Sequence, residues 1–244
     1  MSARRLYRES AGRRNFKAFT VTVKETDLWI AVPRDGFTET LPAGIEELVW
    51  RTRRELESYI SADPEFARTR EPYLVPGNAP KIVLNMVRAG NAAGVGPMAA
   101  VAGALAEIVG RSLLRHRDQV IVENGGDIFW SAVEPLKVAI LAGSSPLSKK
   151  IALLVEPAGP CGLCTSSGTS GHAFSEGRAD AAVILSPSAA LADAAATAVG
   201  NRVRRPADLE EALSFARQID GVAGAAIICG DQVALWGRLQ LQPL

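Results

Sequence analysis

Apolar residues occur along the chain in short runs that turn residues separate, and this pattern predicts many short strands. Residues 24–27 and 230–231 are turn signals, so the runs on either side of each should form hairpins. The runs expected to be strands are FKAFTVTV, LWIAV, QVIVEN, IFWSAV, KVAILA, IALLV, ADAAVIL, GAAIIC and QVALWG.

Apolar positions at helical spacing predict four helices, and these alternate with the strands. They cover residues 43–60, 97–114, 187–199 and 208–219. The segment KIVLNMV fits either a strand or the start of a helix, and the glycine- and serine-rich residues 159–177 are expected to form a loop. Strands therefore come both as hairpins and beside helices, which predicts an α+β fold with mainly antiparallel sheet and packed helices.

Composition predicts one α+β domain over residues 16–244, preceded by a basic, solvated arm at residues 1–15. Of the 244 residues, 48% are apolar and 22% are charged, and the net charge is +1, so no overall field favours nucleic acid or a membrane surface. The most apolar segment, residues 97–110, is short and contains Glu107, which indicates a buried helix. With three cysteines and no apolar run after the basic start, we expect a cytoplasmic protein.

The helix at residues 187–199 is almost entirely alanine, yet it contains Asp193 and Thr197. Ser186 is its expected cap, and the four-residue spacing places Asp193 and Thr197 on one face. Carboxylate and hydroxyl oxygens suit Mg²⁺, while small neighbours let a ligand approach. The alternative is structural: Asp193 caps a loop amide or pairs with an arginine, and Thr197 bonds the carbonyl one turn back.

Two glycine-containing segments are candidates for ligand contact. Gly125 and Gly126 follow a predicted buried strand, where glycines allow either close approach to a ligand or a plain hairpin turn. The segment CTSSGTSGH, residues 164–172, has the small side chains and free amides of an anion-binding nest, or forms a surface loop. Its histidine, His172, could act as a general base or contact a phosphate, and a plain surface position is the alternative.

Cys161 and Cys164 form a single CxxC motif. A zinc site would need further soft ligands, and a thioredoxin-like role would need a βαβ context. The motif therefore allows two interpretations: a redox or sulfur-relay role, or two buried thiols with a structural role.

Taken together, these segments resemble the ApbE superfamily, the FAD:protein FMN transferases, and in particular a divergent branch of it. The resemblance rests on IVENGGDI, CTSSGTSGH and AAVILSPSAALADAAATAVG, with ELESYISADPEF and MAAVAGALAE upstream. It runs weakly from about residue 43 and strongly over about residues 119–200.

The resemblance implies two related subdomains with FAD, or FMN, between them and Mg²⁺ at the diphosphate. Asp193 and Thr197 would be metal ligands, and His172 and Asp193 would be catalytic. The implied nucleotide contacts are Gly125, Gly126, Asp127, Thr165, Ser166, Ser167, Gly168 and His172. The chemistry would be attack of a threonine of a protein acceptor on the FAD diphosphate, with AMP leaving, or cleavage of that diphosphate.

Two departures from the family pattern accompany the resemblance. Ala102 stands where the family has a lysine, and HAFSEGRAD replaces an Asp-Pro followed by a Thr-Gly. We therefore expect nucleotide binding with weak or absent FMN transfer. A non-catalytic nucleotide-binding protein and a sulfur or redox accessory protein using Cys161 and Cys164 are the alternatives, and a homo-oligomer is left open.

Overall fold

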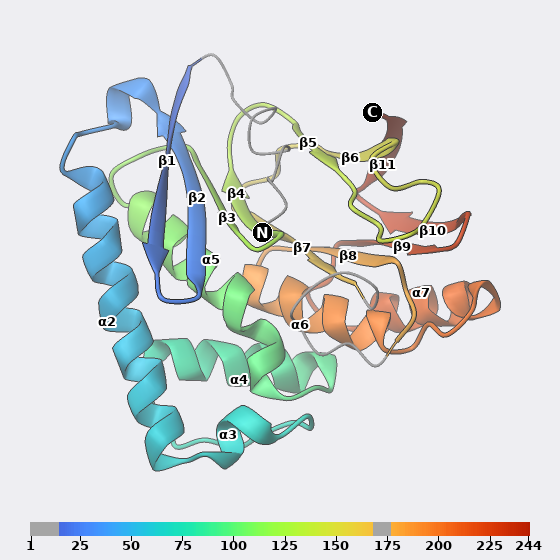
Figure 1. The fold of residues 1–244 in the computed structure, drawn as a ribbon, viewed down its shortest axis with the longest axis horizontal. Coiled ribbons are helices and arrows are strands. Elements are labelled where there is room, and N and C mark those ends of the chain that lie inside the picture. Colours follow the sequence, from blue (N-terminus) through green and yellow to red (C-terminus); the bar gives the residue numbers. More distant parts are fainter. Residues whose placement is uncertain (1–14, 168–176) are drawn as a thin grey trace.

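The computed structural model describes residues 15–167 and 177–244, and its centre is an eight-stranded sheet in which every neighbouring pair is antiparallel (Figure 1). Its strands, in spatial order, are β1 (Phe16–Val23), β2 (Thr26–Pro33), β3 (Val120–Asn124), β4 (Asp127–Ser131), β7 (Cys161–Ser166), β8 (Ala181–Ser186), β9 (Gly224–Cys229) and β10 (Gln232–Gly237). A smaller sheet contains β11 (Gln240–Pro243), β6 (Ile151–Val155) and β5 (Leu136–Ala139) in that order. The predicted α+β fold with antiparallel sheets is confirmed.

Two halves of the large sheet repeat one topology, which confirms the related subdomains. In the first half, an antiparallel pair, β1–β2, is followed by helices and then by the pair β3–β4. In the second half, β7–β8 is followed by helices and then by β9–β10. In both halves the inner strands are neighbours, β2 with β3 and β8 with β9, and β4 pairs with β7 to join the halves.

The helices lie on one face of the large sheet (Figure 1). The first half contains α2 (Leu41–Ala62), α3 (Glu65–Arg68), α4 (Lys81–Ala93) and α5 (Val101–Leu113), with 3-10 turns at Arg34–Gly36 and Pro97–Ala100. The second half contains α6 (Ala189–Gly200), a 3-10 turn at Pro206–Asp208, and α7 (Leu209–Gln218). Among the described helices, none is by itself long and apolar enough to cross a membrane. The helix α4 and the Pro97–Leu113 segment, with a bend of 104° between them, have that length and apolar composition only when they are taken together.

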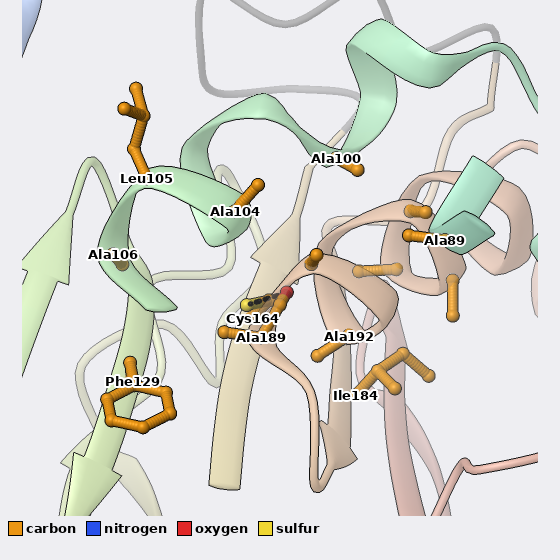
Figure 2. Close-up of a cluster of buried hydrophobic side chains, with 14 of the residues drawn as sticks. Ala89, Ala100, Ala104, Leu105, Ala106, Phe129, Cys164, Ile184, Ala189 and Ala192 are labelled. Carbon is orange, nitrogen blue, oxygen red and sulfur yellow. Dashed lines mark hydrogen bonds between the residues drawn. The ribbon is translucent and has the colours of Figure 1, made fainter. Parts of the chain in front are cut away.

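Successive side chains of each strand point to opposite faces of the large sheet, and this divides the core into two layers. On β4, Phe129 packs with the helices, whereas Ile128 and Trp130 pack in a second cluster with residues of the small sheet. On β7, Cys164 belongs to the helix layer and Cys161 to the other. Figure 2 shows the helix layer, where many of the side chains between the sheet and the helices are alanines, so that the backbones pack closely.

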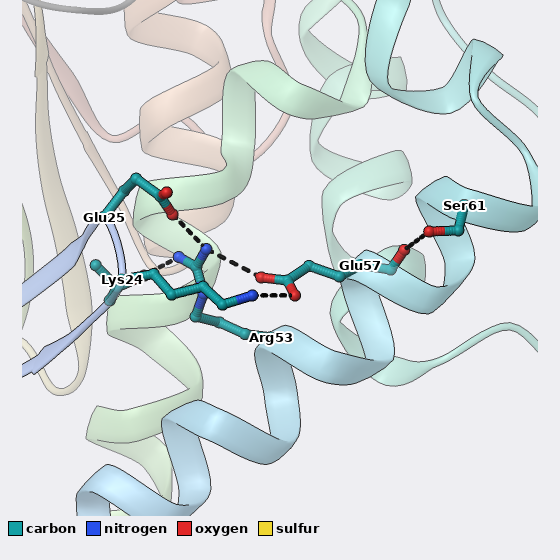
Figure 3. A network of polar contacts seen from close by, with 6 residues as sticks. Lys24, Glu25, Arg53, Glu57 and Ser61 are labelled. Carbon is teal, nitrogen blue, oxygen red and sulfur yellow. Dashed lines mark hydrogen bonds and ion pairs between the residues drawn. The ribbon is translucent and has the colours of Figure 1, made fainter.

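The long helix α2 is fixed to the β1–β2 turn by a polar network (Figure 3). The Arg53 guanidinium donates to Thr26 Oγ1 and Glu25 Oε2, both at 2.6 Å, and to Glu57 Oε1 at 3.1 Å. Lys24 Nζ completes the network at 2.6 Å from Glu57 Oε2. These contacts hold the first hairpin against the helical layer.

The structure decides the alternative left open for one segment and corrects several other expectations. KIVLNMV opens helix α4, because its buried positions recur at helical spacing. Residues 161–166, expected in a loop, form β7, a central strand paired with β4 and β8. Their small residues have a low intrinsic preference for strands, but pairing and burial on both faces of the sheet outweigh it. The expected helix at residues 97–114 begins with a 3-10 turn, and strand β11 was not expected.

The N-terminus of the alanine-rich helix also differs from the expectation. Helix α6 begins at Ala189, and its cap is Ser188, whose side chain accepts a bond from the Leu191 amide at 3.3 Å. Ser186 is instead the last residue of β8, and its hydroxyl accepts from the Ser188 amide at 3.1 Å. The predicted arm at residues 1–15 falls, except for residue 15, outside the described residues.

Candidate functional site

The turn between β3 and β4 has a conformation that favours glycine. Gly125 has φ of +69° and Gly126 has φ of +114°, values that residues with side chains rarely adopt. A Cβ on either would meet no described atom within 4 Å, so conformation, and not crowding by the protein, explains both glycines. The Gly126 amide donates to Glu123 Oε1 at 2.7 Å, which fixes the turn. Its outer side is therefore accessible to a ligand.

Four of the implied nucleotide contacts line one cavity of about 220 Å³. These are Gly125, Gly126, Thr165 and Ser167. The other walls are apolar and come from β4, β7 and β8 of the large sheet and from β5, β6 and the residues that follow β5. Segments that are distant in the sequence thus form one pocket with a polar rim and an apolar interior. Ser166 does not line this cavity and lies on the helix side of β7, near Gly200.

Asp127 connects the glycine turn to β7. Its Oδ1 accepts a hydrogen bond from the Thr165 amide at 3.3 Å, and its side chain is buried. Burial raises the pKa of this carboxyl to about 7, the Glu123 charge raises it further, and the Cys164 thiol and Thr165 amide oppose the shift. Asp127 is therefore a buried acid that becomes charged near neutral pH.

Asp193 lies on α6 and contacts the N-terminus of α5. Its Oδ2 accepts from the Gly103 amide at 2.9 Å, so the structural alternative, the capping of an amide, is realised for one oxygen. Burial, followed by the charge of Asp127, raises the pKa of Asp193 well above its usual value, and the amides of Gly103 and Ala102 offset part of this. The charge of Asp127 thus disfavours the charged form of Asp193, and the two acids occur in one region of the fold.

Thr197 lies one turn beyond Asp193 on α6 and is, like Asp193, half-buried. Over residues 15–167 and 177–244, Thr197 Oγ1 makes no hydrogen bond, whereas the Asp193 carboxylate interacts with the amides of Gly103 and Ala102. Thr197 Oγ1 therefore remains available to a ligand. Neither residue lines the 220 Å³ cavity: its apolar walls belong to the second layer, whereas α6 packs in the helix layer on the other face of the large sheet.

The alanine content of α6 follows from close packing against α5 and β7. A Cβ on Gly103 would lie 2.8 Å from the Asp193 Cβ and would overlap the Ala189 carbonyl. A Cβ on Gly162 of β7 would lie 2.7 Å from the Ala189 Cβ. Larger side chains in α6 would push these backbones apart, so small residues on three elements position Asp193.

The two cysteines of the CxxC motif point to opposite faces of β7. Cys164 Sγ donates to the Ala189 carbonyl at 3.3 Å in the helix layer (Figure 2), whereas Cys161 lies in the second layer. Burial raises the pKa of Cys161 to about 11 and that of Cys164 well above its usual value. In the described part of the chain, no group of three or more histidine, cysteine or acidic side chains could hold a metal ion. These observations argue against a zinc site or a dithiol redox pair.

Sequence reasoning missed three residues of this region. Asn124 Nδ2 donates to the Ala102 carbonyl at 3.1 Å, Glu123 fixes the glycine turn, and Gly103 bonds Asp193. The position of Asn124 and Glu123 directly before the glycine pair was the available signal. Gly168 and His172 lie outside the described residues, so their predicted roles stay predictions.

Comparison with solved structures supports the fold. Flavin Transferase ApbE from Vibrio cholerae superposes with a TM-score of 0.62 at 14% identity, covering 91% of this chain and 96% of that one. The apo form of the Pseudomonas stutzeri flavinyl transferase ApbE superposes with a TM-score of 0.56 at 14% identity, covering 91% and 94%. At such identity the likeness establishes the fold alone.

Sequence relatives establish the family. A UPF0280 protein of Methanosarcina acetivorans is 43% identical over 204 residues, covering 81% of this chain and 80% of the relative. A UPF0280 protein of Methanothrix thermoacetophila is 47% identical over 191 residues, covering 77% and 80%. The family model described as AbpE bacteria matches residues 8–235. This chain therefore belongs to the AbpE bacteria family and has UPF0280 proteins among its relatives.

Proposed function

We propose that this protein binds a flavin nucleotide together with Mg²⁺ and acts on the nucleotide's diphosphate. The observation that carries the proposal is the convergence of the Gly125–Gly126 turn with Thr165 and Ser167 around one cavity, with Asp127 bonded to the Thr165 amide. Asp193 is included in the proposed site because the charge of Asp127 acts on its carboxyl group. An apolar pocket with a few polar groups and acids of shifted pKa nearby has the character of a ligand site.

The cavity fits one ring system better than a whole dinucleotide. Its volume of about 220 Å³ lies below the range of roughly 300–1,000 Å³ common for complete ligand sites. Apolar walls from two sheets suit the faces of a flavin ring, and the rim of glycine amides and hydroxyls suits its polar edge. The remainder of the nucleotide would extend along the turn towards Asp127.

The carboxylates fit a divalent cation. Asp127 and Asp193 are each destabilised as anions by burial, and in addition by the charge of Glu123 for Asp127 and by the charge of Asp127 for Asp193. A nearby Mg²⁺ would relieve these effects. Asp193 Oδ1 and Thr197 Oγ1 are the oxygens that would hold the ion, and Mg²⁺ prefers such hard ligands. When bound, the ion would neutralise charge that develops on the diphosphate.

The chain's own residues would orient the nucleotide and exclude water. Gly125 and Gly126 let the backbone approach it, and Asp127 holds β7 in register with the turn. His172 is proposed, from the family resemblance, to contact the reacting phosphate or to take the proton from the attacking hydroxyl. That hydroxyl would belong to a threonine of a protein acceptor in the transfer reaction, or to water in diphosphate cleavage.

Transfer to an acceptor is expected to be weak. At the α5 N-terminus, Ala102 offers a methyl group where the family resemblance expects a lysine, and its carbonyl accepts a bond from Asn124. Loss of one charged donor to a developing anion costs about a hundredfold to a thousandfold in rate. Nucleotide binding, which depends on the cavity, should persist.

The test is a titration of the purified protein with FAD, FMN and AMP, with and without Mg²⁺, followed by measurement of AMP release. Asp193→Asn should abolish the Mg²⁺ dependence while the fold remains. Asp208→Asn is the matched control, because Asp208 is also half-buried and its Oδ2 accepts from the backbone amides of Arg204 and Arg205, at 2.9 and 3.1 Å, but it does not line the cavity. Absence of binding to all three nucleotides would refute the proposal.

A further inference from the structure

A second concave surface lies on the helical side of the molecule, and we name it the basic trough. Three adjoining hollows of about 520, 260 and 380 Å³ share lining residues and together cross α2, α4, α5 and the start of α6. Arg51 is shared by the first two hollows, and Lys81 and Arg111 by the last two. They therefore form one continuous surface.

Positive charge is concentrated in the trough. In the part of the chain that the structure describes, six cationic and two acidic side chains line it: Arg51, Arg54, Lys81, Arg88, Arg111 and Arg115 against Glu55 and Glu107. The whole chain has a net charge of only +1, so this excess is local. Like charges gathered without partners raise the energy of the free protein, and a bound anion would lower it.

The trough's acid Glu107 is already occupied by the protein. Its Oε1 accepts from Arg111 Nε at 2.7 Å, and its Oε2 accepts from the Ser188 hydroxyl at 2.8 Å and from the Ala190 amide at 3.2 Å. It therefore neutralises Arg111 and no other cation of the trough. Within the described residues, Arg51, Lys81, Arg88 and Arg115 form no ion pair and are exposed.

The arrangement of the cations suits an extended ligand. They come from three helices and are spread along the trough, and Leu48, Ile82 and Leu191 provide apolar surface between them. Among the described residues, no glycine lines the trough, and Tyr59, which is half-buried, is the one aromatic side chain that does. A phosphate nest would offer convergent amides, and a single-stranded nucleic-acid site would offer aromatic stacking surfaces. An acidic polypeptide with interspersed apolar residues matches the trough better than either.

The trough ends beside the candidate site. Ser188, the cap of α6, and Leu191 on α6 line its last hollow, and Asp193 lies on the same helix. Glu107 lies one turn beyond Gly103 on α5, and Gly103 bonds Asp193. We infer that the basic trough docks an acidic segment of the protein acceptor, so that the acceptor's hydroxyl is held near α6. This inference rests on the proposed function for the acceptor's role, while the binding itself can be measured without flavin.

The experiment measures binding of a fluorescent, glutamate-rich peptide with interspersed leucines, by anisotropy and without nucleotide. The double variant Arg88→Glu/Arg115→Glu should weaken binding about tenfold or more, and rising salt should weaken binding to the wild type. The matched control is Lys150→Glu/Arg204→Glu, which changes the net charge equally at exposed positions outside the trough and should leave affinity nearly unchanged. Titration of each variant with FAD shows whether the substitutions in the trough also change binding at the nucleotide site.

Four results would overturn the inference. The peptide could fail to bind, or the two double variants could lose affinity equally, which would show attraction by net charge alone. An oligodeoxynucleotide of equal charge could bind more tightly than the peptide and lose affinity in the trough variant. The protein could also self-associate through the trough, as ultracentrifugation of wild type and variant would reveal. Peptide binding that survives a failure to bind FAD would support docking and refute only the flavin proposal.

Discussion

The Gly103 amide on α5 donates a hydrogen bond of 2.9 Å to Asp193 Oδ2 on α6. This contact holds Oδ2 of Asp193 in place, and the Ala102 amide next to it also interacts with the carboxylate. It depends on the absence of a side chain at position 103, because a Cβ there would overlap the Ala189 carbonyl. A single glycine thus allows the close approach of α5 to α6, the helix that contains both candidate metal ligands.

Gly103→Ala should therefore lower the free energy of unfolding by about 1–3 kcal/mol, as overpacked cores do, and should disturb Mg²⁺ binding. Urea denaturation and metal titration would measure both effects. Gly44→Ala in α2 is the control, because a Cβ there meets no described atom within 4 Å. That change should be neutral or stabilising by up to about 1 kcal/mol. Equal effects of the two substitutions would show that the α5–α6 contact is not tight.

A pH dependence follows from the raised pKa values of Asp127 and Asp193. A carboxyl whose pKa is higher in the folded than in the unfolded state favours folding at low pH. For Asp127 this stabilisation should be lost as the pH rises from about 4 to about 7. Asp127→Asn and Asp193→Asn should each lose less stability than the wild type over this pH range. Other carboxylates contribute equally to the wild type and to the variants, so their effect cancels in the comparison.

Urea denaturation at several pH values would measure this difference. Mg²⁺ added to the wild type near pH 8 should restore stability by mass action, and Asp193→Asn should not respond. A wild-type stability that rises between about pH 4 and pH 7 relative to both variants would contradict the burial of these acids.

Ser188→Ala should lower the free energy of unfolding by about 1–2 kcal/mol, because the side chain caps α6 and also donates to Glu107. Ser188→Thr, which keeps the hydroxyl, should retain most of the stability. Ser188→Asp should be worse than threonine despite being a good cap in isolation, since its charge would face Glu107. Thermal denaturation of the three variants gives the order, and an aspartate as stable as threonine would contradict the contact with Glu107.

Local patterns predicted most of the fold. The alternating runs around turn signals gave the first and last hairpins, and the spacing of apolar residues gave α2 and α7. The order of strands and helices was enough for an antiparallel α+β arrangement. These elements could be predicted because their burial repeats along the sequence with the period of the local structure.

Elements whose stability comes from distant contacts could not be predicted this way. Strand β7 is made of small residues, and it is a strand because β4 and β8 pair with it on both sides. The role of Gly103 depends on a residue ninety positions later, Asp193. Likewise the sequence showed that Asp193 and Thr197 share a face, but not that the candidate nucleotide cavity would form on other elements, in the second layer of the core.

The cysteines provide the test that separates a structural from a redox role. Cys161 and Cys164 are three positions apart in one strand, so their side chains point to opposite faces and cannot form a disulfide with each other while β7 is intact. Burial also raises the pKa of each thiol, which leaves little of the reactive thiolate at neutral pH.

An aromatic disulfide reagent should therefore modify neither cysteine in the native protein and both in urea. Ser58→Cys, an exposed position on α2, is the positive control and should react at once in the native state. Cys161→Ala and Cys164→Ala should each cost about 1 kcal/mol of stability and keep nucleotide binding, because neither thiol lines the cavity. Rapid native modification of Cys164, followed by mass spectrometry, would instead favour the sulfur or redox function over the flavin proposal.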